Sequence, residues 1–239
     1  MYYDLMSLYG DWANAEVLAL ELKARGADVV IDKKTVDDEI NFGDYDLLYI
    51  GSGTERSLIA CIADISKQKA ALLERIDEGM HVLATGNSHE IFGMVVTDNK
   101  GTKHDALGLI DFETVQGNGR VTGDCICKAS FLEEKLVGFI NRASIGQIGR
   151  AYRPFDVLLG PGASDESETG VKTEAIEYKN LLGTYLTGPI LIRNPPLLRH
   201  FTDRILGEQM KTCANQFSEI QETAYKKTLE ELSKRIGEK

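Results

Sequence analysis

The first part of the chain alternates between short apolar runs and longer amphipathic stretches. Apolar positions recur at helical spacing through residues 13–25, and Gly26 stands where a helix-ending glycine is common. A strand–helix–strand rhythm of this kind is typical of βαβ units. The pattern therefore predicts an α/β fold built on a doubly wound, mostly parallel sheet. The expected elements are helices at 13–25 and 55–78 and strands at 28–32, 46–50 and 81–85.

From about Thr97 the long helices give way to short segments of alternating character. The segments at 107–114, 120–128 and 135–141 predict antiparallel strands packed against the parallel sheet. Gly160–Gly170 is rich in glycine, serine and acidic residues and predicts a surface loop. Further on, residues 181–189 predict a strand that ends in a tight turn, and Pro195-Pro196 open a helix that runs to about Gly207.

The last part of the chain, Phe217 to Ile236, is charged and helical in pattern. Two interpretations of this helix stay open: a surface helix packed on its own domain, or a docking helix for a partner. We expect a main domain over residues 1–210 and a helical extension over 211–239. The helix carries a partial apolar stripe of Phe217, Ile220, Ala224, Leu229 and Leu232.

Composition narrows the class of protein. A net charge of -10 over 239 residues argues against a nucleic-acid-binding surface, because nothing basic is concentrated enough to gather phosphates. No apolar run approaches the roughly 20 residues that span a bilayer, and the amino terminus lacks a signal-peptide pattern. We therefore expect a cytoplasmic protein with reduced cysteines. Cys125 and Cys127 share one face of an expected strand, which favours packing over a metal site; no metal or cofactor is expected.

Two glycine-containing turns follow expected strands. Gly51-Ser52-Gly53 comes after strand 46–50, and Thr85-Gly86-Asn87 comes after strand 81–85. Ligand sites in doubly wound sheets lie at the carboxyl ends of the strands, so we expect both turns to face one pocket. The first turn is either an anion cradle of free N–H groups or a plain strand-to-helix turn. The second has the frame of a nucleophile elbow, but no cysteine stands at its apex.

The string Tyr178–Leu191 is long and unusual, and with other segments it carries a resemblance to a known family. The chain resembles class I glutamine amidotransferases of the cobyric-acid-synthase (CobB/CobQ) type, and in particular GatD-type glutaminase subunits of lipid II isoglutaminyl synthase. The resemblance implies a flavodoxin-like class I amidotransferase fold with additional antiparallel strands. It also implies a Mur-ligase-like synthetase as partner, in bacterial cell-wall (peptidoglycan) chemistry. The other matching segments are Asp4–Asp11, Tyr49–Arg56, Leu107–Thr114 and Gly119–Asp124.

Family members hydrolyse glutamine with a cysteine nucleophile and a histidine that takes and returns the proton. When the family's elbow motif is matched so that its last glycine is Gly93, the cysteine position falls on Gly86. The catalytic histidine position falls on Thr187. Glycine carries no nucleophile and threonine does not titrate near neutrality, so the resemblance implies that nucleophile and base are both missing.

Other family positions also carry different residues here. The two glycines after the elbow cysteine correspond to Asn87 and Ser88, and the elbow glutamine corresponds to Glu90. A family His-Gly pair corresponds to Arg142-Ala143. In contrast, Arg120 stands where GatD-type proteins carry an arginine implicated in substrate contact, and its guanidinium could hold a carboxylate.

The favoured hypothesis is a non-catalytic, glutaminase-like binding subunit, that is, a pseudoenzyme. One alternative is an active glutaminase whose catalytic residue or geometry this matching misplaces, with Ser88 and Cys61 as the residues to test. A second is a hydrolase whose nucleophile is Ser88, although its hydroxyl is expected to cap backbone N–H groups, and its neighbour His89 points about 100° away on a helix. The expected site residues for a small carboxylate or glutamine-like ligand are Gly51, Ser52, Gly53, Gly86, Asn87 and Arg120.

Overall fold

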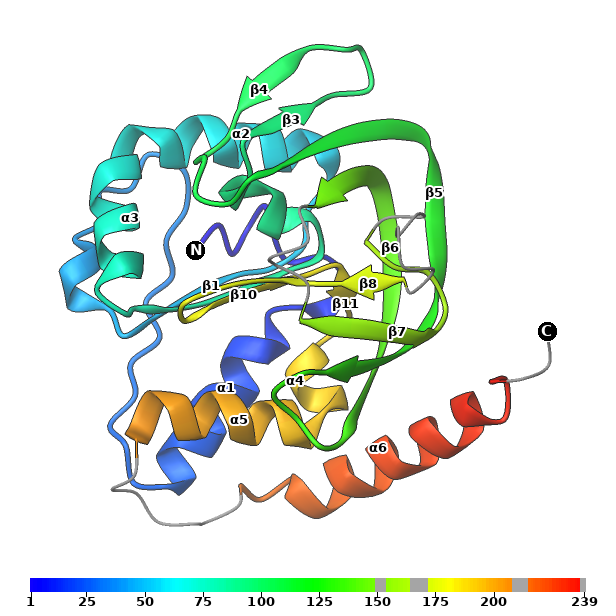
Figure 1. The fold of residues 1–239 in the computed structure, drawn as a ribbon. Coiled ribbons are helices and arrows are strands. Elements are labelled where there is room, and N and C mark those ends of the chain that lie inside the picture. Colours follow the sequence, from blue (N-terminus) through cyan, green and yellow to red (C-terminus); the bar gives the residue numbers. More distant parts are fainter. Residues whose placement is uncertain (149–153, 164–171, 208–214, 237–239) are drawn as a thin grey trace.

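A parallel sheet with one antiparallel edge forms the centre of the protein (Figure 1). The structure is a computed structural model, and it describes residues 1–148, 154–163, 172–207 and 215–236. The strand order in this sheet is β1-β2-β10-β9, with β1, β2 and β10 parallel and β9 antiparallel to β10. These strands are β1 (Leu47–Ile50), β2 (His81–Thr85), β9 (Ile176–Tyr178) and β10 (Leu181–Thr184).

Helices cover both faces of this sheet, as in a doubly wound fold. In Figure 1, α2 and α3 lie on one face and α1 and α5 on the other. Local signals fix where two of them start: the Thr54 side chain accepts a hydrogen bond from the Ser57 N–H at 3.0 Å, and prolines occupy the first turn of α5. The bounds are α1 (Ala13–Ala24), α2 (Glu55–Ile65), α3 (Lys69–Asp77), α4 (Ile190–Arg193) and α5 (Pro195–Leu206), with 3-10 helices at Leu8–Gly10, Phe42–Asp44 and Ser66–Gln68.

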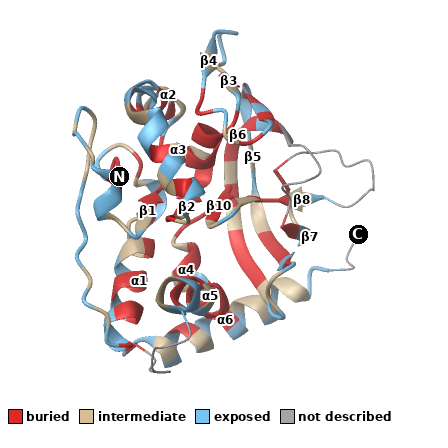
Figure 2. Cartoon of the chain, turned by 60° about the vertical axis from the view of Figure 1, so that its left-hand side comes forward, coloured by how far each residue is buried: buried red, intermediate tan, exposed pale blue. Residues whose placement is uncertain are grey.

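A second, mostly antiparallel sheet packs beside the first. Its order is β11-β6-β5-β3-β4, with β7 pairing β5 and β8 pairing β7. One continuous core joins the two sheets, and buried positions concentrate between the layers (Figure 2). The strands are β3 (Val95–Thr97), β4 (Lys103–Asp105), β5 (Phe112–Ala129), β6 (Lys135–Ile148), β7 (Phe155–Leu159), β8 (Thr173–Glu174) and β11 (Leu186–Thr187).

The α/β prediction with added antiparallel strands is confirmed, whereas several boundaries differ from those expected. Residues 28–32 were expected to form a strand, but they have no regular structure because none of the described strands pairs with them. The expected helix 55–78 is divided by a 3-10 turn at Ser66–Gln68, and the expected strand 181–189 breaks at Tyr185 into β10 and β11 of different sheets. Of the expected loop 160–170, residues 164–170 lie outside the described residues.

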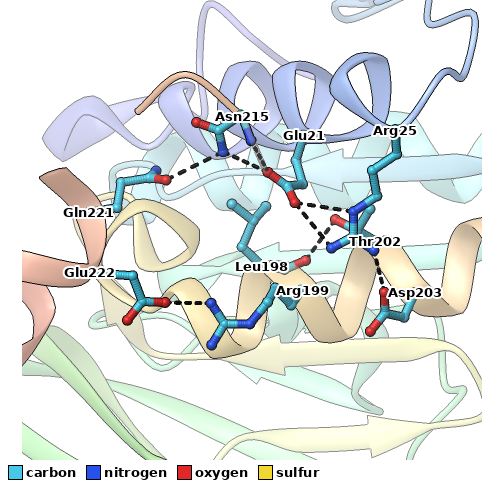
Figure 3. Close-up of polar contacts among 9 residues, drawn as sticks. All are labelled: Glu21, Arg25, Leu198, Arg199, Thr202, Asp203, Asn215, Gln221 and Glu222. Atoms are coloured by element: carbon cyan, nitrogen blue, oxygen red, sulfur yellow. Dashed lines mark hydrogen bonds and ion pairs between the residues drawn. The ribbon is translucent and has the colours of Figure 1, made fainter. Parts of the chain in front are cut away.

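The C-terminal helix α6 (Ser218–Ser233) lies across the second sheet. Tyr225 packs with Ile126 and Val137, and its hydroxyl donates to the Lys135 carbonyl at 2.7 Å. Before the helix, the Asn215 side-chain amide donates to Glu21 of α1 at 2.7 Å (Figure 3). One face of α6 is therefore packed on its own chain, while Ile220 stays 70% exposed on another face.

Two further expectations concern membrane spans and cysteines. Within the described residues, no helix is long and apolar enough to cross a bilayer. Cys125 and Cys127 are free and fully buried on β5, and burial raises the pKa of both thiols, that of Cys125 to about 12. The expected packing role of this pair is confirmed.

Candidate functional site

The elbow at the end of β2 has the backbone of a nucleophile turn. Gly86 has a φ of +64°, a left-handed conformation that glycine adopts at little cost. Residues Gly86–Phe92 then form a 3-10 helix. The turn lies beside Gly51–Gly53, so the structure brings together the two turns that the sequence placed at the carboxyl edge of the sheet.

The apex of this elbow is filled. A Cβ atom added to Gly86 would lie 2.2 Å from Ser52 Cβ and 3.1 Å from Ser52 Cα. Contacts as short as the first do not occur between real side chains, so a residue larger than glycine requires Ser52 to move. The space in which a side chain at position 86 would begin is thus occupied by the neighbouring turn.

A buried carboxylate, Asp11, ties the turns around the elbow together. One carboxylate oxygen accepts hydrogen bonds from the Ser52 N–H at 2.9 Å and the Thr85 hydroxyl at 3.0 Å. The other oxygen accepts from the Gly188 N–H at 2.9 Å. Asp11 is fully buried; burial raises the pKa of its carboxyl, and the hydrogen bonds from Ser52, Thr85 and Gly188 oppose that shift. The Asp11 backbone carbonyl also accepts from the Tyr49 hydroxyl at 2.7 Å.

The N–H groups of the glycine turn point at oxygens of this same chain. The Ser52 N–H donates to Asp11, and the Gly53 N–H donates to the Asn87 side-chain oxygen at 3.0 Å. These are two of the donors that an anion cradle would offer to a ligand. Asn87, which follows the elbow apex, therefore takes a place that an oxyanion or carboxylate would otherwise take.

Thr187, which the sequence matching pairs with the catalytic histidine, makes a hydrogen bond to a neighbouring strand. It is 3% exposed, and its hydroxyl donates to the Phe139 carbonyl of β6 at 3.1 Å. The following residue, Gly188, reaches Asp11 through its N–H. The β11 end thus stands close to the elbow without contributing a group that can exchange a proton near neutral pH.

Ser88 and His89 face backbone oxygens rather than each other. The Ser88 hydroxyl lies 2.9 Å from the Ile50 carbonyl and 2.8 Å from the Thr85 carbonyl, so the expected capping of N–H groups is wrong: its contacts are to acceptors. His89 Nδ1 donates to the Gly86 carbonyl at 2.7 Å, and burial lowers the pKa of the ring to about 4. Within the described residues the two side chains form no pair, and both are almost fully buried.

Arg120 lies at an exposed polar cluster near the start of α2. Its guanidinium contacts the Glu55 carboxylate at 2.9 Å and the Asn141 side-chain oxygen at 2.6 Å. Asn141 in turn donates to the Tyr9 hydroxyl at 2.9 Å. An exposed ion pair of this kind contributes little stability, so a carboxylate ligand could replace Glu55 as the partner of Arg120.

Comparison with known protein families shows the family of this chain. The model of the CobB/CobQ-like glutamine amidotransferase domain matches residues 1–195. The chain belongs to this family. The resemblance found from the sequence is therefore confirmed.

Two curated relatives are similar over most of the chain. The lipid II isoglutaminyl synthase (glutamine-hydrolyzing) subunit GatD of Staphylococcus aureus (strain N315) is 34% identical over 195 residues, which cover 80% of this chain and 76% of that protein. The protein of the same name from Streptococcus pneumoniae (strain ATCC BAA-255 / R6) is 28% identical over 200 residues, covering 82% of this chain and 75% of that protein.

Solved structures agree on the fold. A crystal structure of a glutamine amidotransferase has a TM-score of 0.56 at 15% identity, covering 85% of this chain and 98% of that chain. The structure of PurLQS from Thermotoga maritima has a TM-score of 0.51 at 13% identity, with 81% and 88% of the two chains covered. At such identities these likenesses show the class I amidotransferase fold alone.

A buried network of charged and polar side chains lies beneath the elbow. Glu90, which the sequence matching pairs with a glutamine, accepts hydrogen bonds from the hydroxyls of Thr114 at 2.8 Å, Ser144 at 3.1 Å and Tyr185 at 3.1 Å. Arg142, which the sequence matching pairs with a histidine, is 2% exposed, and its guanidinium lies 5.9 Å from the Tyr185 ring centre.

A second buried acid completes this network. Glu174 accepts from the Thr184 hydroxyl at 2.6 Å and from the Tyr185 N–H at 2.7 Å. Burial raises the pKa of Glu90 and of Glu174 to about 7, and the nearby Arg142 charge opposes the shift at Glu174. Within the part of the chain that the structure describes, Glu90 and Glu174 are thus fully buried and held by hydrogen bonds from their own chain.

Sequence reasoning did not single out Asp11, Glu174 or Tyr185. Asp11 was visible as part of the matching segment Asp4–Asp11, but its partners lie 41 to 177 residues away in the chain. The signal for the acidic network was the unusual glutamate at position 90. An acidic residue inside a buried helical turn requires hydroxyl or cationic partners, and the sequence does not specify which ones.

Proposed function

We propose that this chain is a non-catalytic GatD-type subunit, which keeps the amidotransferase scaffold for binding and takes part in lipid II modification. The observation that carries the proposal is the filled elbow, with Ser52 in the space of a residue-86 side chain. The engagement of the Ser52 and Gly53 N–H groups by Asp11 and Asn87 supports the same conclusion. Cell-wall chemistry enters through the relatives named GatD.

The contacts of the remaining candidates support this proposal over an active enzyme. Ser88 is held by two carbonyl oxygens, and the buried His89 is neutral at physiological pH and occupied by the Gly86 carbonyl. Burial also raises the pKa of the Cys61 thiol to about 12, so almost none of it is thiolate at neutral pH. None of Ser88, His89 and Cys61 therefore takes part in a nucleophile–base pair with another described residue.

Glutamine hydrolysis by the purified chain tests the proposal. We expect no ammonia release above that of buffer, with or without a synthetase partner present, and no difference between the wild type and either Ser88→Ala or Cys61→Ala. A GatD relative that hydrolyses glutamine serves as the positive control. Ammonia release that disappears in one of the two variants would establish an active glutaminase and reject the proposal.

Binding of a small carboxylate at the Arg120 cluster is part of the proposal. We expect glutamine or glutamate to bind weakly and the Arg120→Ala variant to weaken that binding by roughly tenfold, because a charge-assisted contact is lost. Glu55→Gln should strengthen it, since the competing carboxylate is removed. Titration calorimetry measures both effects. Equal affinity in the wild type and Arg120→Ala would place any ligand elsewhere.

The partner we propose is a Mur-ligase-like synthetase in the cytoplasm. Support comes from the relatives, whose names describe subunits of a synthase. Co-purification of the full chain with such a synthetase would test this. Failure to form a complex would reject the proposed partner and would leave the proposed lack of catalysis unaffected.

A further inference from the structure

Tyr9 has a left-handed backbone conformation inside the short 3-10 helix Leu8–Gly10, with a φ of 62° and a ψ of 18°. This conformation costs free energy for any residue with a Cβ atom, and it is uncommon for a bulky side chain. The side chain of Tyr9 is 48% exposed, so burial of the ring offsets only part of that cost. Backbone strain of this kind persists where the surroundings hold a residue in place, and it is common at ligand sites.

Hydrogen bonds on both sides of Tyr9 hold its turn against Ser52. The Leu8 N–H donates to the Ser52 carbonyl at 2.9 Å, and the Ser52 N–H donates to the Asp11 carboxylate at 2.9 Å. The Asp11 N–H closes the turn by donating to the Leu8 carbonyl at 3.1 Å. Because Leu8 and Asp11 are both bound to Ser52, the residue that fills the elbow also sets the position of Tyr9.

The Tyr9 hydroxyl contacts Asn141 of β6, which lies 132 residues away in the chain. The Asn141 Nδ2 donates to this hydroxyl at 2.9 Å, and the Asn141 Oδ1 accepts from the Arg120 Nε at 2.6 Å. An arginine side chain only donates hydrogen bonds, so the amide oxygen of Asn141 must face Arg120 and the amide nitrogen must face Tyr9. Tyr9 therefore fixes the rotation of the Asn141 side chain.

Three described contacts hold the guanidinium of Arg120. Besides the Asn141 Oδ1, one terminal nitrogen donates to the Glu55 carboxylate at 2.9 Å and the other to the Asn141 backbone carbonyl at 3.4 Å. Within the described residues, these contacts leave one N–H on each terminal nitrogen for a ligand. A carboxylate binds arginine most strongly when its two oxygens meet two N–H groups, so the orientation of the guanidinium affects the affinity.

We propose that Tyr9 is a positioning residue of the carboxylate site at Arg120 and that it acts through Asn141. The inference rests on the proposed function, because it requires that Arg120 binds a carboxylate. The Tyr9 hydroxyl holds the Asn141 amide, and the amide oxygen holds the Arg120 Nε. The two remaining N–H groups of the guanidinium are thereby kept in place for the ligand. A guanidinium that is already held loses less conformational freedom when a carboxylate binds.

Glutamate binding to the full chain tests this role. Tyr9→Phe removes the acceptor of the Asn141 amide and keeps the ring, and we expect it to weaken glutamate binding about fivefold in titration calorimetry. Tyr3→Phe is the matched control. Tyr3 is similarly exposed, at 42%, and its ring faces the Lys33 Nζ at 5.7 Å, so the loss of its hydroxyl should leave the affinity unchanged.

A double-mutant cycle with Asn141 separates a positioning role from direct contact with the ligand. Asn141→Ala should weaken glutamate binding by a similar factor, because Arg120 loses the same contact. Adding Tyr9→Phe to this variant should cause no further loss, since the hydroxyl then has no amide to hold. An equal effect of Tyr9→Phe in both backgrounds would show that Tyr9 acts without Asn141 and would overturn the proposal.

Two measurements without ligand complete the test. By NMR, the Arg120 Nε hydrogen should exchange with solvent about fivefold faster in Tyr9→Phe than in the wild type or Tyr3→Phe, because the Asn141 oxygen no longer stays in place. Urea unfolding should give the same midpoint for Tyr9→Phe and Tyr3→Phe. Unchanged exchange, or a lower midpoint for Tyr9→Phe than for Tyr3→Phe, would overturn the proposal in favour of a structural role.

The same titrations separate this inference from the proposed function. If Arg120→Ala weakens glutamate binding and Tyr9→Phe does not, the carboxylate site is retained and Tyr9 has no part in it. If Arg120→Ala binds glutamate as the wild type does, or if neither binds it, the carboxylate site itself is rejected, and the role of Tyr9 is rejected with it.

Discussion

Replacing Asp11 by alanine is expected to destabilise the fold by about 4 kcal/mol, because the Ser52 N–H, the Gly188 N–H and the Thr85 hydroxyl lose their buried acceptor together. Asp11→Asn should destabilise the fold by an intermediate amount. Its amide nitrogen must face either the Ser52 N–H or the Gly188 N–H, and it cannot accept a hydrogen bond from that group. Urea unfolding monitored by circular dichroism measures the free energies.

The matched control for Asp11 is Asp4→Ala. The Asp4 carboxylate also accepts from a threonine hydroxyl, that of Thr35 at 2.7 Å, but at an exposed site. Its loss should change the free energy of unfolding by less than about 0.5 kcal/mol. If Asp11→Ala and Asp4→Ala unfolded at the same urea concentration, the carboxylate would not hold the turns of the elbow together.

The second large effect is a fall in stability between about pH 4.5 and pH 7. Burial raises the pKa of Glu90 and Glu174 from 4.5 to about 7 in the folded chain. Between these values the folded state binds more protons than the unfolded state, so the free energy of unfolding falls as pH rises. The contribution of each carboxyl to the free energy of unfolding is fully present below the unfolded pKa of 4.5. It falls by about 1.4 kcal/mol per pH unit and is lost as the pH rises through the folded pKa of about 7.

The Glu90→Gln/Glu174→Gln variant isolates this contribution from the other carboxylates. Glutamine can keep hydrogen bonds at both sites, because hydroxyls that donate to Glu90 can rotate to accept, and the Tyr185 N–H can still reach an amide oxygen at position 174. We expect this variant to have a flatter pH profile and to be more stable than wild type at pH 8. Chemical denaturation from pH 4 to 9 measures both profiles; superimposable curves would show that the two acids do not titrate in this range.

Much of the fold was readable from local patterns. The helix opened by Pro195-Pro196 and the buried strands at 46–50 and 81–85 follow directly from proline and apolar runs. The strand expected at 28–32 failed for a reason outside the segment: β propensity forms a strand only where a partner offers hydrogen bonds, and here β1 lies across a groove. The break at Tyr185 was likewise invisible, because it depends on the side chain of Glu174 binding the Tyr185 N–H.

The positions of the two turns were predictable from the sequence, but the contacts that their residues make were not. Matching motifs located the two turns, and the structure places them side by side. That Gly86 and Thr187 stand at the catalytic positions stays a prediction. The sequence could not show that Ser52 fills the apex or that Asn87 binds the Gly53 N–H, since both depend on ångström-scale packing. For the same reason, we expect Gly86→Cys with Thr187→His to lack glutaminase activity unless Ser52 is also replaced by glycine.

The central claim is that Ser52 closes the elbow, and the coupling free energy between positions 52 and 86 tests it most directly. Gly86→Ala alone should cost about 3 kcal/mol, of which roughly 1 comes from the left-handed backbone and the rest from overlap with Ser52. In a Ser52→Gly background the 2.2 Å overlap with the Ser52 Cβ is removed and only the 3.1 Å contact with the Cα remains, so the same substitution should cost about 1.5 kcal/mol. Urea unfolding of the wild type, Gly86→Ala, Ser52→Gly and the double variant gives the four free energies of this double-mutant cycle. An equal cost of Gly86→Ala in both backgrounds would show that the elbow is open and would contradict the account.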